Sequence, residues 1–220
     1  MADNVVSTSS KAGAFLEKNV KLLVGIIVVL LIFVGIAVLG SSLNRKSVEK
    51  GLSEIDSIEY TFKKGIDDLS AEDLTARQDK ALEDLEVLSA KGGITGVRAN
   101  MLKAEILFEK NDFENSRLAW VKAADSKKSA YTASICYYNA AVCSENLNDL
   151  EGAVNYYTKS VKNEEFYLID HAYFSLGRVN ESKGDVEAAL SAYQKINDIH
   201  PSSSWASVAK TRIIAINAAK

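Results

Sequence analysis

The sequence has little of what interrupts helices. Its 220 residues include one proline, Pro201, and only 12 glycines. Because proline is the strongest helix breaker, such a chain can form long uninterrupted helices. The composition is otherwise that of a folded protein, with 47% hydrophobic and 25% charged residues. The length allows one domain of ordinary size and an appendage.

Residues that carry catalysis are equally scarce. The chain has two histidines, His171 and His200, and no HExxH, paired CxxC, GxxxxGK[ST] or GxSxG motif. The glycine-rich residues 92–96 lack the lysine and the preceding strand of a phosphate loop, so a turn between helices is expected there. His171 with Glu181 is the nearest approach to a catalytic pair. We therefore predict that the chain is not an enzyme and has no catalytic residue, metal site, cofactor or small-molecule substrate.

The net charge and the cysteine positions argue against a nucleic-acid partner and against an intrachain disulfide. The net charge of −3 gives no reason to expect a nucleic-acid partner. Cys136 and Cys143 are seven residues apart in one expected helix, a rise of about 10.5 Å. Cysteines whose Cα atoms are more than about 7 Å apart cannot be bridged without moving the backbone. We therefore interpret both as small apolar core residues rather than as a disulfide.

One long hydrophobic run stands near the N-terminus. Residues 22–39 read LLVGIIVVLLIFVGIAVL, 18 residues without a charge. As a helix they would cover about 27 Å, close to the hydrocarbon thickness of about 30 Å. A core helix of a soluble protein usually keeps a polar stripe, and a signal peptide has a shorter apolar region of about 7 to 15 residues. We predict an N-terminal tail over residues 1–21 and an uncleaved transmembrane helix over residues 22–40.

The charges that flank this run do not decide its orientation. Three basic residues precede it and three follow it, so the positive-inside count is tied. They are Lys11, Lys18, Lys21, Arg45, Lys46 and Lys50.

Two helices are expected directly after the span. Apolar residues recur every three to four positions over residues 41–66, which predicts a juxtamembrane helix within a segment 41–69. A second helix is expected over residues 71–90. Ser70 and Asp73 form a signal close to a capping box at its start, and Gly92 and Gly93 are expected to stop it.

The rest of the chain repeats itself with a period near 36 residues. The equivalent positions Ala81, Ser116, Ala153 and Ala189 are 35, 37 and 36 residues apart. Around the last three, a small residue stands twelve positions before, an acidic turn lies between, and an aromatic residue follows four positions later. The small residues are Ala104, Ala141 and Gly177; the turns contain Asp112, Asp149 and Asp185; the aromatic residues are Trp120, Tyr157 and Tyr193. The pattern predicts three helix–turn–helix units, with residues 71–90 as a fainter fourth. Small residues would let the paired helices approach closely, and each aromatic would fill the space toward the next hairpin.

These units resemble tetratricopeptide repeats. Residues 170–203 carry the family pattern at Tyr173, Leu176, Gly177, Ala189, Tyr193 and Pro201, and depart from it at Asn180, where the family prefers tyrosine. Residues 134–167 match moderately, and residues 98–131 match by register. The resemblance implies an all-α fold, with an α-α superhelical solenoid over residues 70–220. A C-terminal capping helix is expected over residues 203–218, with an apolar stripe of Trp205, Val208, Ala209, Ile213 and Ile216.

The same resemblance implies a binding face for protein partners. Repeats of this family bind on the concave surface, which the first helix of each hairpin lines. By register, that face would consist of Arg98, Met101, Glu105, Phe108, Ile135, Tyr138, Val142, Glu145, His171, Phe174, Arg178 and Glu181. Met101, Tyr138 and Phe174 could form an apolar strip, or could pack against the juxtamembrane helix or each other. They stand where the family members that clamp acidic C-terminal tails need lysine, so that specificity is not expected.

The order of segments is similar to that of the YfgM-like family, ancillary subunits of the bacterial SecYEG translocon. The shared features are a short tail, one span, a juxtamembrane helix and a degenerate repeat domain, together with the stretch from Phe15 to Leu22 before the span. The resemblance implies a single-pass inner-membrane protein with periplasmic repeats, and with the translocon, periplasmic chaperones or secretory clients as partners. A scaffold subunit of a bacterial envelope assembly, such as a flagellar motor or an outer-membrane assembly complex, is the alternative.

Overall fold

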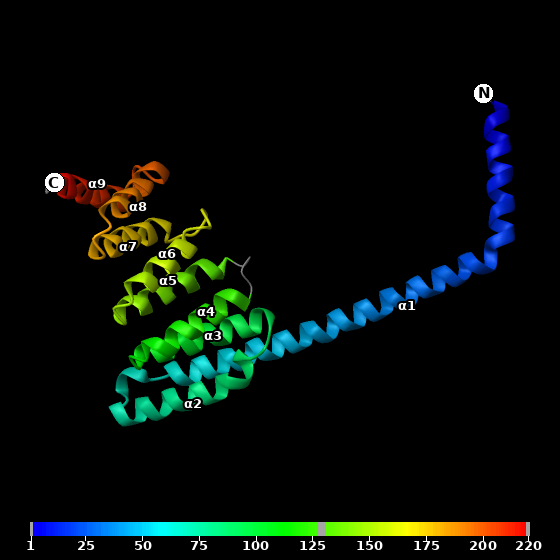
Figure 1. Cartoon of the computed structure of the whole chain (residues 1–220). Coiled ribbons are helices and arrows are strands. Elements are labelled where there is room, and N and C mark those ends of the chain that lie inside the picture. Colours follow the sequence, from blue (N-terminus) through cyan, green and yellow to red (C-terminus); the bar gives the residue numbers. More distant parts are fainter. Residues whose placement is uncertain (1, 127–130, 219–220) are drawn as a thin grey trace. The chain divides into compact units, whose positions relative to one another are not determined.

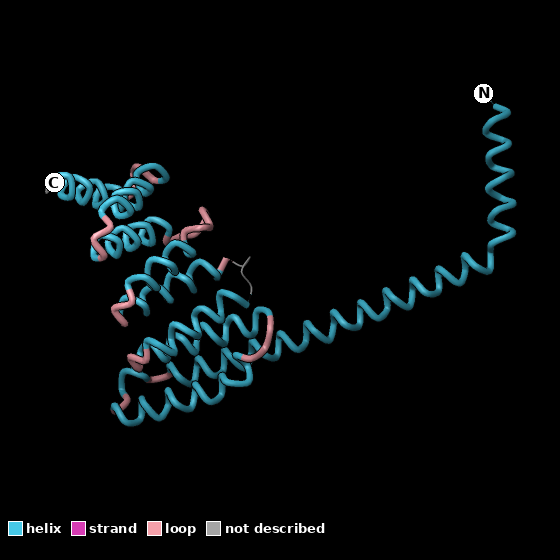
Figure 2. Tube along the Cα trace, viewed as in Figure 1, coloured by secondary structure: helices cyan, strands magenta, loops and turns pink. Residues whose placement is uncertain are grey.

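The computed structural model describes residues 2–126 and 131–218, except for the side chains of residues 2–12, 14, 16, 17 and 23. Over these residues the regular structure is entirely helical, which confirms the predicted fold class (Figure 2). The elements in chain order are α1 (Ala2–Lys63), the 3₁₀ turn η1 (Ile66–Asp68), α2 (Ala71–Ser89), α3 (Gly93–Glu109), α4 (Phe113–Ser126), α5 (Thr132–Asn146), α6 (Leu150–Ser160), α7 (Ile169–Ser182), α8 (Val186–Ile199) and α9 (Ser204–Ala218).

The chain forms two compact units, Met1–Lys50 and Gly51–Lys220. The first consists of the N-terminal part of α1. This helix continues without a break through the segments predicted as tail, span and juxtamembrane helix, because no proline interrupts it. It ends at Lys63, three residues before the expected end, where Gly65 adopts a left-handed conformation with φ 62°. The boundaries of tail and span inside α1 stay predictions.

The apolar stretch of α1 is long and apolar enough to cross a membrane. Its large apolar side chains are about half exposed or more, from Val28 at 48% to Phe33 at 74%. A core helix of a soluble protein would bury such side chains, and a contiguous exposed apolar surface of this length marks a contact with membrane or protein. A membrane span and a signal sequence both fit this helix.

The second unit is a stack of antiparallel helical hairpins (Figure 1). Residues 51–63 of α1 pair with α2, and the pairs α3 with α4, α5 with α6, and α7 with α8 follow, with α9 at the end. The fainter repeat expected over residues 71–90 is therefore the second helix of a hairpin whose first helix belongs to α1. Ser70 caps α2 as expected, since its hydroxyl accepts a hydrogen bond from the Asp73 backbone N–H at 3.1 Å.

The small residues lie at the helix crossings, as the repeat pattern predicts. Ala104, Ser116, Ala141, Ala153 and Ala189 have no exposed surface. The first crossing carries a hydrogen bond, which the Ser116 hydroxyl donates to the Ala104 carbonyl at 2.7 Å. The paired helices therefore touch almost backbone to backbone at these points.

The aromatic residues pack toward the next hairpin, as the repeat pattern predicts. Trp120 shares a buried cluster with residues of α5, Tyr157 shares one with residues of α7, and Tyr193 shares one with residues of α9. Two of the rings also contact their own hairpin. Tyr157 packs edge-on against Tyr138 of its own hairpin, with ring centroids 5.4 Å apart. Tyr193 likewise lies against Phe174 of its own hairpin, at 5.3 Å, and covers Gly177. The small residue on the first helix leaves room for this second contact, so each of these two rings packs within its hairpin as well as toward the next one.

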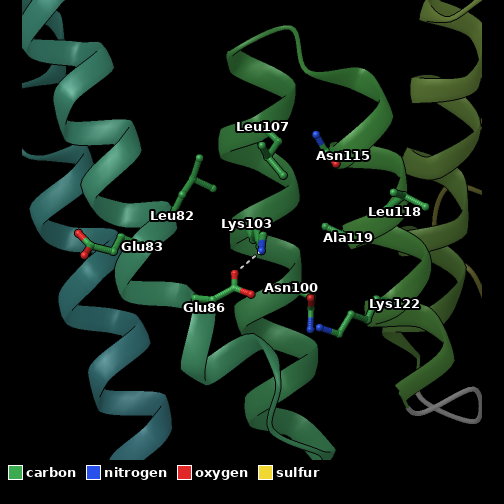
Figure 3. Close-up of a pocket in the computed structure, with 10 residues that line it drawn as sticks. All are labelled: Leu82, Glu83, Glu86, Asn100, Lys103, Leu107, Asn115, Leu118, Ala119 and Lys122. Atoms are coloured by element: carbon green, nitrogen blue, oxygen red, sulfur yellow. Dashed lines mark hydrogen bonds and ion pairs between the residues drawn. The ribbon is translucent and has the colours of Figure 1, made fainter.

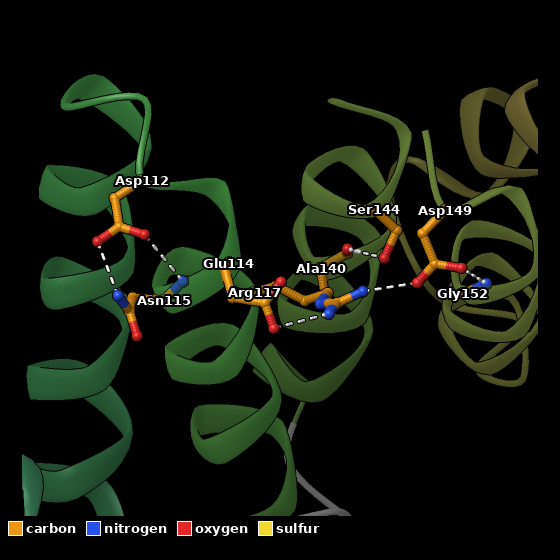
Figure 4. Close-up of polar contacts among 8 residues, drawn as sticks. All are labelled: Asp112, Glu114, Asn115, Arg117, Ala140, Ser144, Asp149 and Gly152. Atoms are coloured by element: carbon orange, nitrogen blue, oxygen red, sulfur yellow. Dashed lines mark hydrogen bonds and ion pairs between the residues drawn. The ribbon is translucent and has the colours of Figure 1, made fainter. Parts of the chain in front are cut away.

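The acidic turns take one conformation three times. The residues before the three aspartates, Asn111, Asn148 and Gly184, have φ of 60°, 57° and 81°. At the second turn, Asn148 N–H and Asp149 N–H bond to the carbonyls of Glu145 and Ser144, the pattern of a Schellman motif. The Asp149 carboxylate then caps α6 by accepting from the Gly152 N–H at 2.9 Å (Figure 4).

Helix α9 closes the stack in the register of a first helix, because Trp205 and Arg212 follow His171 and Arg178 by 34 residues. Ser203 caps it by accepting from the Ala206 N–H. Four members of the expected stripe, Trp205, Ala209, Ile213 and Ile216, pack on the core of the last hairpin. Val208 is 47% exposed and does not belong to that contact.

Candidate protein-binding groove

The predicted binding residues come from equivalent faces of α3, α5 and α7. Most are half-buried, Glu105 and Arg178 are exposed, and Tyr138 is 8% exposed. The face is thus accessible in part, and the structure divides it into regions with different chemistry. Whether a partner binds there stays a prediction.

Met101, Tyr138 and Phe174 do not form an open apolar strip. Met101 packs against the core cluster of the second hairpin. Phe174 lies between Tyr193 and Trp205, with ring centroids 5.3 and 5.1 Å away. Tyr138 contacts Tyr157 and His171. The contacts of these three side chains are thus with neighbouring repeat helices, and not with the juxtamembrane helix or each other as the alternative held.

Arg98 at the start of the face is occupied by α1. Its guanidinium forms ion pairs with Asp56 at 3.0 Å and with Glu59 at 3.6 Å. Because both acids lie on residues 51–63 of α1, the juxtamembrane helix covers this end of the predicted face.

The C-terminal half of the face is closed by a repeated polar contact that we call the glutamate ladder. Glu145 accepts a hydrogen bond from the Tyr157 hydroxyl of its own hairpin at 2.6 Å and forms an ion pair with Arg178 of the next hairpin at 2.6 Å. One repeat later, Glu181 does the same with Tyr193, at 3.0 Å, and with Arg212 of α9. Each step joins both helices of one hairpin to the first helix of the next.

The second step of this ladder perturbs the ionisation of its members. The hydrogen bond from Arg212 lowers the pKa of Glu181, and the weaker effect of the hydrogen bond from Tyr193 lowers it further. Burial and the hydrogen bond to Glu181 raise the pKa of Tyr193 to about 12. Glu181 is therefore charged and Tyr193 keeps its proton at neutral pH, as their contact requires.

A pocket opens where the ladder is missing, between α3 and α5. This α3–α5 pocket has a volume of about 480 Å³ and is lined by Glu105, Phe108, Glu109, Trp120, Tyr138, Asn139 and Val142. Four of these residues belong to the predicted face. Glu109, Trp120 and Asn139 were not predicted, although Trp120 could have been found from its register with Tyr157 and Tyr193.

Acidic groups dominate the rim of the α3–α5 pocket. Desolvation by the surrounding residues raises the pKa of Glu105, the field of Lys63 lowers it, and the negative charges of Glu59 and Glu109 raise it further. The Lys63 ammonium is itself hydrogen-bonded to Glu59 at 2.7 Å. The pocket therefore combines apolar walls with an excess of negative charge.

His171 and Glu181 do not form a catalytic pair, because each is engaged elsewhere. The Nδ1 atom of His171 lies 3.0 Å from the Tyr138 hydroxyl, and its ring stacks on Trp205 with centroids 4.5 Å apart. Burial, and then the charge of Arg178, lowers the pKa of His171. Among the residues with described side chains, no group of three histidine, cysteine, aspartate or glutamate side chains could hold a metal ion.

A second pocket, of about 540 Å³, lies over α3 between α2 and α4, outside the predicted face (Figure 3). Leu82, Leu107, Leu118 and Ala119 contribute its apolar surface, and Lys103 pairs with Glu86 across it at 2.6 Å. Its charges are of both signs. No motif in the sequence pointed to it, because it forms only where three helices meet.

Comparison with known proteins agrees with the repeat geometry. The sequence model of the tetratricopeptide repeat family matches residues 145–204, which run from the end of α5 through α8. A TPR repeat-containing protein of Treponema pallidum (strain Nichols) is 31% identical over 147 residues, which make up 66% of this chain and 62% of that protein. The chain thus spans less than two thirds of this relative's length. The family match thus shows a tetratricopeptide repeat over residues 145–204, and the hairpins before it stack in the same antiparallel way.

Proposed function

We propose that this chain is a non-enzymatic protein–protein interaction module anchored in a membrane by residues 22–40. The α3–α5 pocket carries the proposal, because it is a concave, mostly apolar site on the face that tetratricopeptide repeats use for partners. The apolar helix supports the anchor. Anchoring would hold a partner near the membrane, since tethering makes a second contact nearly intramolecular and raises its effective concentration.

We further propose the YfgM-like arrangement, with the N-terminus in the cytoplasm and the repeats in the periplasm. The order of segments supports it, whereas the basic residues on the two sides of the span are tied. Fusion of a reporter enzyme that is active only in the periplasm to the C-terminus tests this orientation. Activity is expected there and not from an N-terminal fusion. An inactive C-terminal fusion that is expressed at full length would disprove periplasmic repeats.

Site-specific photo-cross-linking in cells tests the interaction itself. A photoreactive residue at Asn139 lines the α3–α5 pocket, and one at the exposed Asn155 of α6 is the matched control. We expect protein adducts from position 139 in excess over position 155. Translocon subunits, chaperones or secretory clients in those adducts would support the YfgM-like role. A stoichiometric envelope complex without translocon subunits would favour the scaffold alternative, and absence of adducts from position 139 would contradict a binding pocket.

A further inference from the structure

The α3–α5 pocket lies at a step of the repeat register where both charged ladder residues are replaced by apolar ones. Phe108, Glu145 and Glu181 are equivalent, at spacings of 37 and 36 residues. Val142, Arg178 and Arg212 are also equivalent, at spacings of 36 and 34 residues. Where later repeats place a glutamate against an arginine, this step therefore places Phe108 against Val142, and neither side chain can form an ion pair.

The third member of the ladder is replaced as well. Trp120 stands where Tyr157 and Tyr193 donate their hydroxyl groups. An indole ring is apolar over both faces, so the pocket gains an aromatic wall instead of a hydrogen bond. Together these three replacements leave the groove open here, whereas the ladder fills it further along.

The acids at this step have no arginine from the following helix. Glu105 and Glu109 lie on the pocket rim. Arg178 and Arg212 supply a cation to the later steps, but at the equivalent place this step has Val142. Lys63, whose field reaches both rim acids, is bonded to Glu59. The rim is thus negatively charged beside apolar and aromatic walls.

We propose that the α3–α5 pocket binds a segment of a partner protein that presents an arginine or lysine beside an apolar or aromatic side chain. The inference rests on the proposed function and names the chemistry of the partner. The partner's cation takes the place that Arg178 and Arg212 take in the later repeats, and pairs with Glu105 and Glu109. Its apolar neighbour fills the pocket against Phe108 and Trp120.

Each part of such a segment meets a suitable surface. Arginine forms strong, charge-assisted hydrogen bonds with carboxylates and also stacks on aromatic rings. A few side chains, most often tryptophan, tyrosine or arginine, supply most of the affinity at protein interfaces when they fill desolvated pockets. An acidic segment is disfavoured, because its carboxylates would meet those of Glu105 and Glu109.

A peptide array probed with the full-length protein in nonionic detergent micelles tests the proposal. Each peptide carries one pair of neighbouring residues, covering all pairs, in a glycine–serine frame. We expect arginine or lysine beside an apolar or aromatic residue to be enriched. In the double variant Glu105→Gln/Glu109→Gln this preference should fall about tenfold or more, because charged hydrogen bonds contribute that much to binding. Glu165→Gln, a change in an exposed loop outside the pocket, should leave it unchanged.

A second variant restores the missing cation from within the chain. Val142→Arg places an arginine where the later repeats have one, so binding of the enriched peptides should be lost. Circular dichroism confirms that each variant is folded. Enrichment of acidic peptides, or a preference that survives in the double variant, would overturn the proposal. If no peptide binds but position 139 still cross-links to proteins, the inference fails and the proposed function stands; if neither occurs, both fail.

Discussion

Gly177 is the point at which the packing of the last hairpin is most sensitive to one added methyl group. A Cβ atom built on Gly177 lies 2.5 Å from Cε1, 2.7 Å from Cδ1 and 2.8 Å from Cζ of Tyr193. The Tyr193 ring cannot easily retreat, because it is 1% exposed and its hydroxyl is bonded to Glu181. The substitution Gly177→Ala therefore forces either the ring or the helix crossing to move.

Two effects of opposite sign determine the size of the change. Alanine in place of a helical glycine favours the helix by about 1 kcal/mol. Overpacking of a well-packed core costs about 1 to 3 kcal/mol. Because the overlap falls on the middle of a buried ring and not on the end of a flexible chain, we expect the second effect to dominate. The free energy of unfolding should fall by up to about 2 kcal/mol.

Urea unfolding of the full-length protein in micelles measures this change. Both tryptophans, Trp120 and Trp205, lie in the helical unit, so their fluorescence reports its unfolding. With a urea dependence of about 2 kcal/mol per molar, the urea midpoint should drop by up to about 1 M.

A double-mutant cycle identifies the Tyr193 ring as the cause. In a Tyr193→Leu background the clash is gone, so Gly177→Ala should become neutral or stabilising by up to about 1 kcal/mol. If Gly177→Ala is as destabilising with leucine at position 193 as with tyrosine, the contact does not account for the glycine and the reasoning is refuted.

Three further predictions follow from the turns and the buried side chains. Asn148→Ala should destabilise by about 1 to 2 kcal/mol in urea unfolding, because φ is 57° there, whereas Asn148→Gly should not destabilise. Cys136 and Cys143 are free and buried, and burial raises the pKa of Cys136 to about 12, so a disulfide reagent should label them only after unfolding; rapid native labelling would contradict this. Burial and Arg178 lower the pKa of His171, so the unfolded chain binds a proton at this residue at a higher pH than the folded chain does. The contribution of His171 to the free energy of unfolding should therefore be complete above about pH 6.5 and should decrease as the pH falls below that value. His171→Gln should flatten this dependence of the free energy of unfolding on pH.

The hairpin architecture could be predicted because it depends on residues that recur. The period near 36, the small residues at the crossings and the aspartate caps each satisfy a local requirement of two antiparallel helices. Such requirements are written into every repeat, so the pattern identifies them. The same holds for Ser70, whose capping role depends only on residues next to it in the chain.

The binding face was predictable only as a set of positions. Register places Tyr138 and Phe174 on one face, but their exposure depends on neighbours in other helices, such as Trp205 of α9. The α3–α5 pocket likewise depends on which side chains are absent from a ladder that is itself visible only in three dimensions. The sequence predicted separate tail, span and juxtamembrane segments where the structure has the single helix α1, because charge and composition change along it. The helix is continuous because no proline interrupts its backbone.

The glutamate ladder affects the stability of this face and its availability for binding to different degrees. Partly exposed ion pairs such as Glu145 with Arg178 add little to the free energy of unfolding. They do fix which charges remain available, because a carboxylate bonded to an arginine and a tyrosine has few sites left for a partner. The two C-terminal steps are satisfied in this way within the domain. The step at Phe108 and Val142 has no such ion pair, although the following two steps have one. The carboxylates beside it therefore remain available, and this is the physical reason to expect a partner at the α3–α5 pocket.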